Sequence, residues 1–174
     1  MKNAVSFLSS MILLFLCVSP GISQIKTQGE PITNKIEIKS SIPFIKMPEF
    51  DVTRYLEEDA FHNDNPSKTF RFAKTFVQHI NIIEQGKLHI LENGDQLYRL
   101  GIVSEGAVSL NFTFSYYYLP PGATLFIYNP DKTQCLGAFT NKNNKQSKVL
   151  PVGLIESDMA VFEYYQPANA PFGG

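Results

Sequence analysis

The sequence predicts an all-β fold, an antiparallel β-sandwich or the jelly-roll-like variant, with about eight strands and one short N-terminal helix. Two observations support this prediction. Apolar and polar side chains alternate with a period of two over residues 108–114, the clearest strand pattern in the chain. Turn-forming sequences, such as Glu105-Gly106 and 119–122, separate the candidate strands. Because a sheet with one apolar face must be covered, a second sheet is expected.

Residues 1–23 have the features of a secretory signal peptide. Lys2 supplies a positive charge, and 11–18 is an unbroken apolar run that is too short to span a bilayer. Gly21 and Ser23 provide small residues at the −3 and −1 positions of a cleavage site. We therefore expect an exported protein, secreted to the extracellular space or the periplasm.

The composition is that of a single ordinary domain. The chain has 174 residues and is 44% hydrophobic, enough for one buried core. Removing residues 1–23 takes away Lys2 and no acid, so the formal net charge goes from −1 to −2. Because no basic excess exists, nucleic acid is not an expected partner, nor is a membrane after signal cleavage.

Cys135 is the one cysteine that remains after cleavage, so the mature chain cannot close an internal disulfide. Its neighbours Leu136 and Phe139 favour a buried, small apolar side chain. The alternatives are an intermolecular disulfide and a reactive thiol.

The mature chain should begin with an extended arm, residues 24–49, which is interrupted by prolines and carries one edge strand near 35–39. Asp51 is placed to cap a short helix over 52–59. The acids at 57–59 should fray the end of that helix, since the helix dipole disfavours them there. A loop at 62–68 follows.

The β-sandwich domain is expected over residues 50–167, and 168–174 should be a linker. We expect strands at 69–83, 88–91, 96–103, 108–114, 124–128, 135–140, 150–155 and 159–165. Both faces of the strand at 124–128 are apolar, so both should be covered.

Three turns should connect these strands. Asn93-Gly94 favours a hairpin with a type I′ turn, and 129–132 favours a type I turn. A turn at 156–158 would close a last hairpin, and 141–148 should be a solvated loop.

No catalytic, cofactor-binding or metal-binding residue is predicted. The histidines are His62, His79 and His89, and no serine lies in a Gly-x-Ser-x-Gly or Gly-Asp-Ser-Gly-Gly sequence. We expect His79 and His89 on strands. Paired cysteines and His-x-x-x-His spacing are absent, and the acids of 57–59 with His62 are typical of solvated surface.

Residues 116–118, Tyr-Tyr-Tyr, have two interpretations. Their rings could form a platform on which sugars stack. The other interpretation places two of the three in the core and leaves the third exposed. Asn111-Phe112-Thr113 matches the N-glycosylation acceptor, but the match is weak because it lies within a predicted strand.

Several segments, taken in order, resemble the N-terminal, non-catalytic domain of secreted bacterial lysyl-endopeptidase-like, trypsin-like serine proteases, particularly of the Bacteroidetes type. The resemblance runs from about residue 47 to 167. The segments are MPEFDVTRYLEEDA (47–60), FRFAK (70–74), NGDQLYRLGIVSEGAVSLNFTF (93–114), YLPPGATLFIYNPDKTQCLGAFTNKNNK (118–145) and FEYYQP (162–167). The chain departs from the family in Ala73, where glycine is usual, and Tyr98, where tryptophan is usual.

The resemblance implies a domain that assists the folding of a protease or keeps it latent. The family's catalytic domain begins after the segment that matches 164–167, so no catalytic residue of the family maps onto this chain. We therefore expect no enzyme activity of its own, a downstream protease domain as partner, and a processing cut at or after 166–174.

The alternative is a free-standing secreted β-sandwich module that binds glycan or cell-surface material through exposed aromatic side chains such as Tyr117. Whether the chain is a fragment of a longer protein stays open at this stage.

Overall fold

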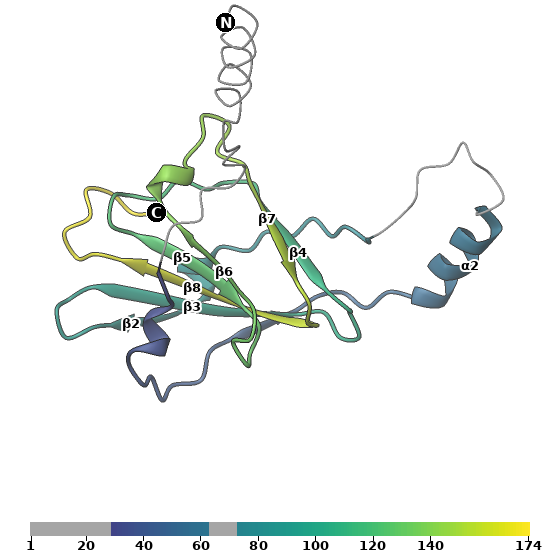
Figure 1. The fold of residues 1–174 in the computed structure, drawn as a ribbon, viewed down its shortest axis with the longest axis horizontal. Helices are drawn as coiled ribbons and strands as arrows, with labels where there is room; N and C mark the ends of the chain where they lie inside the picture. The colour runs from purple at the N-terminus through teal and green to yellow at the C-terminus, as the bar shows by residue number, and fades with distance from the viewer. Residues whose placement is uncertain (1–28, 63–72) are drawn as a thin grey trace, which may run out of the picture.

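The computed structural model describes residues 29–62 and 73–174, and this part of the chain is mainly β (Figure 1). It contains eight strands in two sheets. The strands are β1 (Phe44–Lys46), β2 (Lys87–Ile90), β3 (Gln96–Val103), β4 (Leu110–Phe114), β5 (Thr124–Tyr128), β6 (Cys135–Phe139), β7 (Leu150–Ile155) and β8 (Met159–Gln166). The prediction of a mainly-β fold of about eight strands is therefore confirmed.

The larger sheet has the order β1-β3-β8-β5-β6, and β2 pairs with the same edge of β3 as β1 does. The smaller sheet consists of β4 and β7. The pairing of β1 with β3 is parallel, and the other pairings are antiparallel. β8 lies between β3 and β5 and is hydrogen-bonded along its length to both.

One hydrophobic core joins the two sheets. Phe162 of β8 is 3% exposed, and Phe112 and Phe114 of β4 contact it edge-on, with ring centroids 4.9 and 6.0 Å away. The buried members of this core are Tyr98, Ile102, Leu110, Tyr117, Leu119, Ala123, Leu125, Ile127, Leu150, Val152, Ile155, Ala160, Phe162 and Tyr164. The smaller sheet therefore covers one face of the larger one.

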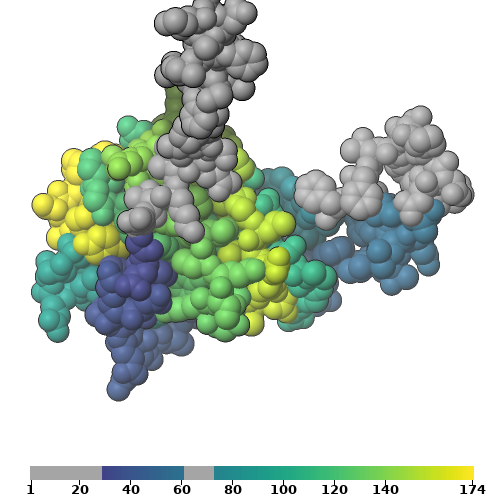
Figure 2. Space-filling model, in the orientation of Figure 1, coloured from purple at the N-terminus to yellow at the C-terminus, as the bar shows by residue number. Residues whose placement is uncertain are grey.

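The N-terminal arm covers the opposite face of the larger sheet. There Phe126, Tyr128, Ala138 and Val161 form a second buried cluster, and Ile42 of the arm packs against it. Figure 2 shows the arm, in purple and blue, lying against the green surface of β5 and β6. Both faces of β5 are covered, as the sequence predicted.

The capped helix is present and longer than predicted. Asp51 Oδ1 accepts hydrogen bonds from the backbone N–H of Thr53 and Arg54 at the start of α2 (Val52–His62), which lies away from the two sheets (Figure 1). The helix continues past the predicted end at 59, and Arg54 forms an (i, i+4) ion pair with Glu58 within it. No helix in the described residues is long and apolar enough to cross a membrane.

The strand predicted at 69–83 is wrong over the residues that are described. Residues 73–81 are irregular, and α3 (Ile82–Gln85) follows, capped by the side chain of Asn81. Residues 63–72, which include most of the predicted loop at 62–68 and Phe70 and Phe72, lie outside the described residues.

The edge strand of the arm lies at β1 rather than at 35–39. Residues 35–39 are irregular and follow a 3-10 turn, η1 (Ile32–Asn34). The ring of Phe44 lies over Gly101 of β3, where a Cβ atom would meet the ring at 2.3 Å. Because glycine leaves this space open, β1 can pair at this position.

The last two strands do not form the predicted hairpin. β7 pairs with β4, whereas β8 pairs with β3 and β5, so the turn at 156–158 carries the chain from the small sheet to the large one. A tight turn can close a hairpin or carry the chain from one sheet to the other. The alternation of side chains along β7 and β8 is the same for both connections, so the sequence does not distinguish them.

The hairpin between β2 and β3 is confirmed, but its turn is not type I′. That turn requires a positive φ at both central residues, and in 91–95 only Gly94 has one (φ 85°). Asn93 Oδ1 instead accepts a hydrogen bond from the N–H of Asp95, and the N–H of Leu91 donates to the carbonyl of Asp95. The predicted type I turn at 129–132 is closed by a hydrogen bond from Lys132 N to Asn129 O.

Replacing Phe162 by alanine should lower the free energy of unfolding by about 3–5 kcal/mol, because removing the buried ring would leave a cavity between the two sheets. Urea unfolding measures this loss. The matched control is Val108→Ala, since Val108 is 89% exposed and lies outside β4, contrary to the predicted strand at 108–114. An equal loss in both variants would contradict the described core.

Candidate functional site

The three consecutive tyrosines follow β4 after a bend at residues 115–116, and the middle side chain is buried while its two neighbours are exposed. Tyr117 is 3% exposed, and its hydroxyl donates a hydrogen bond of 2.8 Å to the carbonyl of Thr140. Burial raises the pKa of Tyr117. Tyr116 and Tyr118 are 64% and 41% exposed. The interpretation with two core tyrosines is therefore wrong, and so is Tyr117 as an exposed ligand contact.

Lys148 lies beside the two exposed tyrosines. Its Nζ atom is 4.6 Å from the ring centroid of Tyr116 and 5.6 Å from that of Tyr118, distances at which a cation is attracted to an aromatic face. The backbone of Lys148 has φ 56°, which is uncommon for a residue with a side chain. Its carbonyl accepts from Tyr117 N at 2.7 Å, and its N–H donates to the carbonyl of Lys145. These bonds hold the strained conformation.

Residues 141–148, predicted as a solvated loop, are mostly exposed but held firmly. Thr140 and Asn143 form a capping box at η2 (Asn141–Asn143). The side-chain amide of Asn144 makes two hydrogen bonds of 2.9 Å with the backbone N–H and carbonyl of Leu119. The loop is thus fixed next to the tyrosine segment.

Phe172 extends this group of rings. Its ring stacks on Tyr118, with centroids 5.5 Å apart and an interplanar angle of 27°, and the C-terminus lies near η2 in Figure 1. We refer to Tyr116, Tyr118, Lys148 and Phe172 as the aromatic–lysine surface. It presents flat apolar faces next to a cation, an arrangement suited to binding rather than to catalysis.

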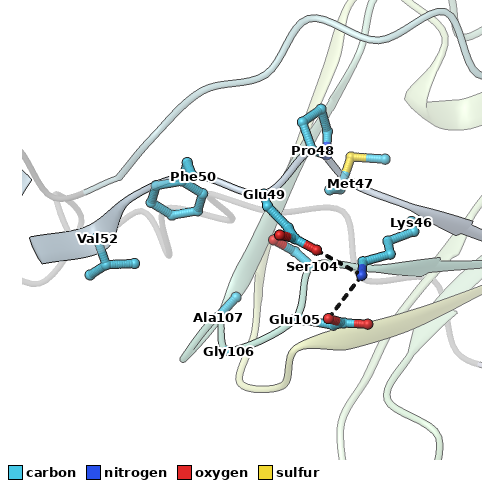
Figure 3. Close-up of a pocket in the computed structure, with 10 residues that line it drawn as sticks. All are labelled: Lys46, Met47, Pro48, Glu49, Phe50, Val52, Ser104, Glu105, Gly106 and Ala107. Atoms are coloured by element: carbon cyan, nitrogen blue, oxygen red, sulfur yellow. Dashed lines mark hydrogen bonds and ion pairs between the residues drawn. The ribbon is translucent and has the colours of Figure 1, made fainter.

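A small pocket lies where the arm passes the β3–β4 turn (Figure 3). Lys46 Nζ contacts carboxylate oxygens of Glu49 and Glu105, each at 3.0 Å, and the hydrogen bonds to Glu105 and Glu49 raise the pKa of Lys46. The volume is about 250 Å³, below the roughly 300–1,000 Å³ of typical ligand pockets. The ion pair between Lys46 and Glu105 holds the arm to the turn. The small volume of the pocket argues against a small-molecule site.

A buried polar cluster lies under the arm. Glu163 of β8 is 1% exposed, and its carboxylate accepts hydrogen bonds from the N–H and hydroxyl of Thr33 and from the hydroxyl of Tyr128. Lys132 Nζ donates to the carbonyl and hydroxyl of Thr33. Burial and the Glu163 carboxylate raise the pKa of Tyr128. This cluster fixes the arm to the sheet.

The structure brings His89 and Ser40 together, which sequence reasoning missed because they are far apart in the chain. Ser40 Oγ is 2.9 Å from His89 Nε2, and a guanidinium nitrogen of Arg99 is 3.3 Å from the same atom. Since arginine only donates, Nε2 is assigned as the acceptor. Partial burial and the positive charges of Arg99 and Lys87 lower the pKa of His89. A histidine that resists protonation is a poor base for activating Ser40.

The other candidate residues from the sequence are not brought into a common site. His79 is exposed in an irregular segment, so its predicted strand position is wrong, and His62 is the last residue of α2, not part of a loop. Cys135 is exposed at the start of β6, so the predicted burial of its thiol is wrong. Asn111 donates a hydrogen bond of 2.7 Å from Nδ2 to the carbonyl of Val152. That contact occupies the nitrogen that glycosylation would modify.

Comparison of the chain with protein-family models, with curated proteins and with solved structures finds no match.

The partial burial of His89 next to the charges of Arg99 and Lys87 should make stability depend on pH. Because the pKa of His89 is lowered in the folded protein, the unfolded chain binds the proton first, and stability should fall as pH drops below the ordinary value of 6.5. His89→Gln, which keeps an acceptor for Ser40 and Arg99, should flatten this fall in urea unfolding between pH 7.5 and 5.5. His79→Gln is the matched control. A wild-type slope in His89→Gln would contradict the assignment.

Proposed function

We propose that this chain is the non-catalytic N-terminal domain of a secreted trypsin-like serine protease, and that its two sheets form a β-sandwich. Signal peptide 1–23 would direct export. The partner would be the protease domain itself, which this domain would help to fold or keep latent.

The observation that carries this proposal is the ordered resemblance over residues 47–167, and two of its segments, 118–145 and 162–167, contact each other in the structure. Residues 118–145 contribute β5, and 162–166 lie in β8, which pairs with all of β5. Gly122, at φ 83°, lies against Pro167, where a Cβ atom would approach the ring to 3.0 Å. Segments that resemble one family and also contact one another support a shared fold better than scattered strand matches do.

The tail constrains how processing would occur. Residues 168–174 are largely exposed, as a processing linker requires, apart from the half-buried Ala170. No lysine or arginine follows Lys148. A lysine-specific protease therefore has no site of its own within 166–174, and a cut inside this stretch would require a protease of different specificity.

The genomic DNA after codon 174 gives the first test. The reading frame is expected to continue into a catalytic domain with His, Asp and Gly-Asp-Ser-Gly-Gly. A stop codon in intact sequence, without these motifs downstream, would remove the covalent form of the proposal.

The second test uses the catalytic domain refolded alone. Adding residues 24–174 in trans should raise the yield of active protease or inhibit it reversibly, because a folded template or blocking surface is supplied. Protease activity on a lysyl peptide substrate measures both effects. The control is Phe162→Ala, whose core is disrupted. No change in either yield or activity would contradict the proposal.

A second candidate function is a secreted binding module for glycan or cell-surface material, and the exposed tyrosine pair favours it. Residues 24–174 should be retained by insoluble cell-surface polysaccharide, and the double change of Tyr116 and Tyr118 to alanine should reduce retention. Thermal unfolding checks that the variant is folded. Equal retention of both proteins would count against this function.

A further inference from the structure

The charge around the aromatic–lysine surface differs from that of the whole chain. The protein carries a formal charge of −1, yet Asp131 is the sole acid between Gly106 and Ile155. The same span contains four lysines, three of them (Lys142, Lys145 and Lys148) in the loop beside the tyrosines. Asp131 lies in the turn before β6, at the far end of that strand from the loop.

These three lysines are not neutralised by the residues that the structure describes. The ion pairs in residues 29–62 and 73–174 involve Lys35, Lys46 and Arg54. Asp95, at the same end of the large sheet, is 8% exposed, and its carboxylate accepts from Tyr165 and Ala168. The surface therefore keeps an uncompensated positive charge that attracts anions.

The aromatic part of the surface is a pair of exposed rings beside one cation. Tyr116 and Tyr118 flank the buried Tyr117, and Lys148 Nζ lies 4.6 Å from the centroid of the first ring and 5.6 Å from that of the second. The buried Tyr117 between them and the hydrogen bonds of Asn144 hold the segment in place. A ligand would meet two rings whose backbone is already ordered, which reduces the entropy lost on binding.

We propose that the aromatic–lysine surface binds an acidic saccharide. A sugar ring stacks on Tyr116, and its carboxylate or sulfate group pairs with Lys148, while Lys142 and Lys145 contact further acidic groups along the polymer. This inference rests on the second candidate function and specifies its ligand class. Nucleic acid shares the negative charge of an acidic saccharide, and the oligo-dT comparison below distinguishes the two.

The test measures binding of residues 24–174 to dextran sulfate and alginate by affinity electrophoresis. Neutral dextran has the sugar backbone of dextran sulfate without its charge, polyglutamate has charge without sugar rings, and oligo-dT represents nucleic acid. Binding to the two acidic polysaccharides should be at least about tenfold tighter than to the three comparison polymers and should weaken as salt rises.

Two variants test the assigned residues. Tyr116→Leu keeps an apolar side chain but removes the ring, and Lys148→Asn removes the charge while tolerating the left-handed backbone. Each should weaken binding about tenfold. The controls are Lys87→Gln, on β2 at the other edge of the large sheet, and Val108→Ala, which should both bind normally.

The outcomes separate the inference from the function on which it rests. Equal binding to dextran, lost in Tyr116→Leu, would overturn the preference for acidic sugars and leave the binding module in place. Equal binding to polyglutamate or oligo-dT, or unchanged binding by either variant, would overturn the inference. Absence of binding to every polysaccharide would overturn both.

Discussion

The burial of Glu163 is the constraint on which the arrangement of the larger sheet depends. Its neighbours Phe162 and Tyr164 face the core between the sheets, so the strand period turns Glu163 to the opposite face. A buried carboxylate is tolerated only when its oxygens are hydrogen-bonded. Tyr128 supplies one donor, and Thr33 of the arm supplies the other two. The arm is thus needed to complete the sheet.

Once Thr33 is fixed, the rest of the arm follows the same face. Arg99 is directly opposite Glu163 in the β3–β8 register, and its guanidinium donates to the carbonyl of Ser40 instead of closing on the carboxylate. Its Nε atom is buried and has no hydrogen-bond partner among the residues that the structure describes. Opposite charges on adjacent strands make each other's burial less costly, even when each is hydrogen-bonded elsewhere. Ile42 and Phe44 then continue the arm into β1.

The alternation of apolar and polar residues located strands such as β3, β4 and β5 well, because it depends on which faces of a strand are covered. It did not predict which strands pair with each other. The hydrophobicity of residues 150–165 is the same for a hairpin as for a crossing between sheets. Residues 76–83 show the opposite failure: Ile80 packs on the core from irregular backbone and Ile82 from the short helix α3. An apolar side chain needs burial but not a strand.

The same reasoning explains which parts of the site were predictable. Aromatic identity marked 116–118, but the alternation of β4, which turns Phe112 and Phe114 to the core, would bury Tyr116 and Tyr118. The bend at 115–116 shifts this alternation, so Tyr117 is buried and its neighbours are exposed. The left-handed backbone of Lys148 and the Ser40–His89 contact depend on long-range packing, so no local sequence pattern predicts them. Cys135 was judged by apolar neighbours in the sequence, whereas its position at the start of edge strand β6 decides its exposure.

Both proposed partners, the protease domain and the polysaccharide, would lie next to Tyr118. A protease domain that continued from residue 174 would begin beside this ring, because Phe172 already stacks on it and Gly174 N donates to Gln166 Oε1. An acidic polymer lying along Tyr116 and Lys148 would reach the same place. If both proposals hold, protease and polysaccharide compete for one end of the sheets, and release of the protease would expose the saccharide surface. A single rigid segment, locked by Tyr117 and Asn144, would then serve both partners in turn.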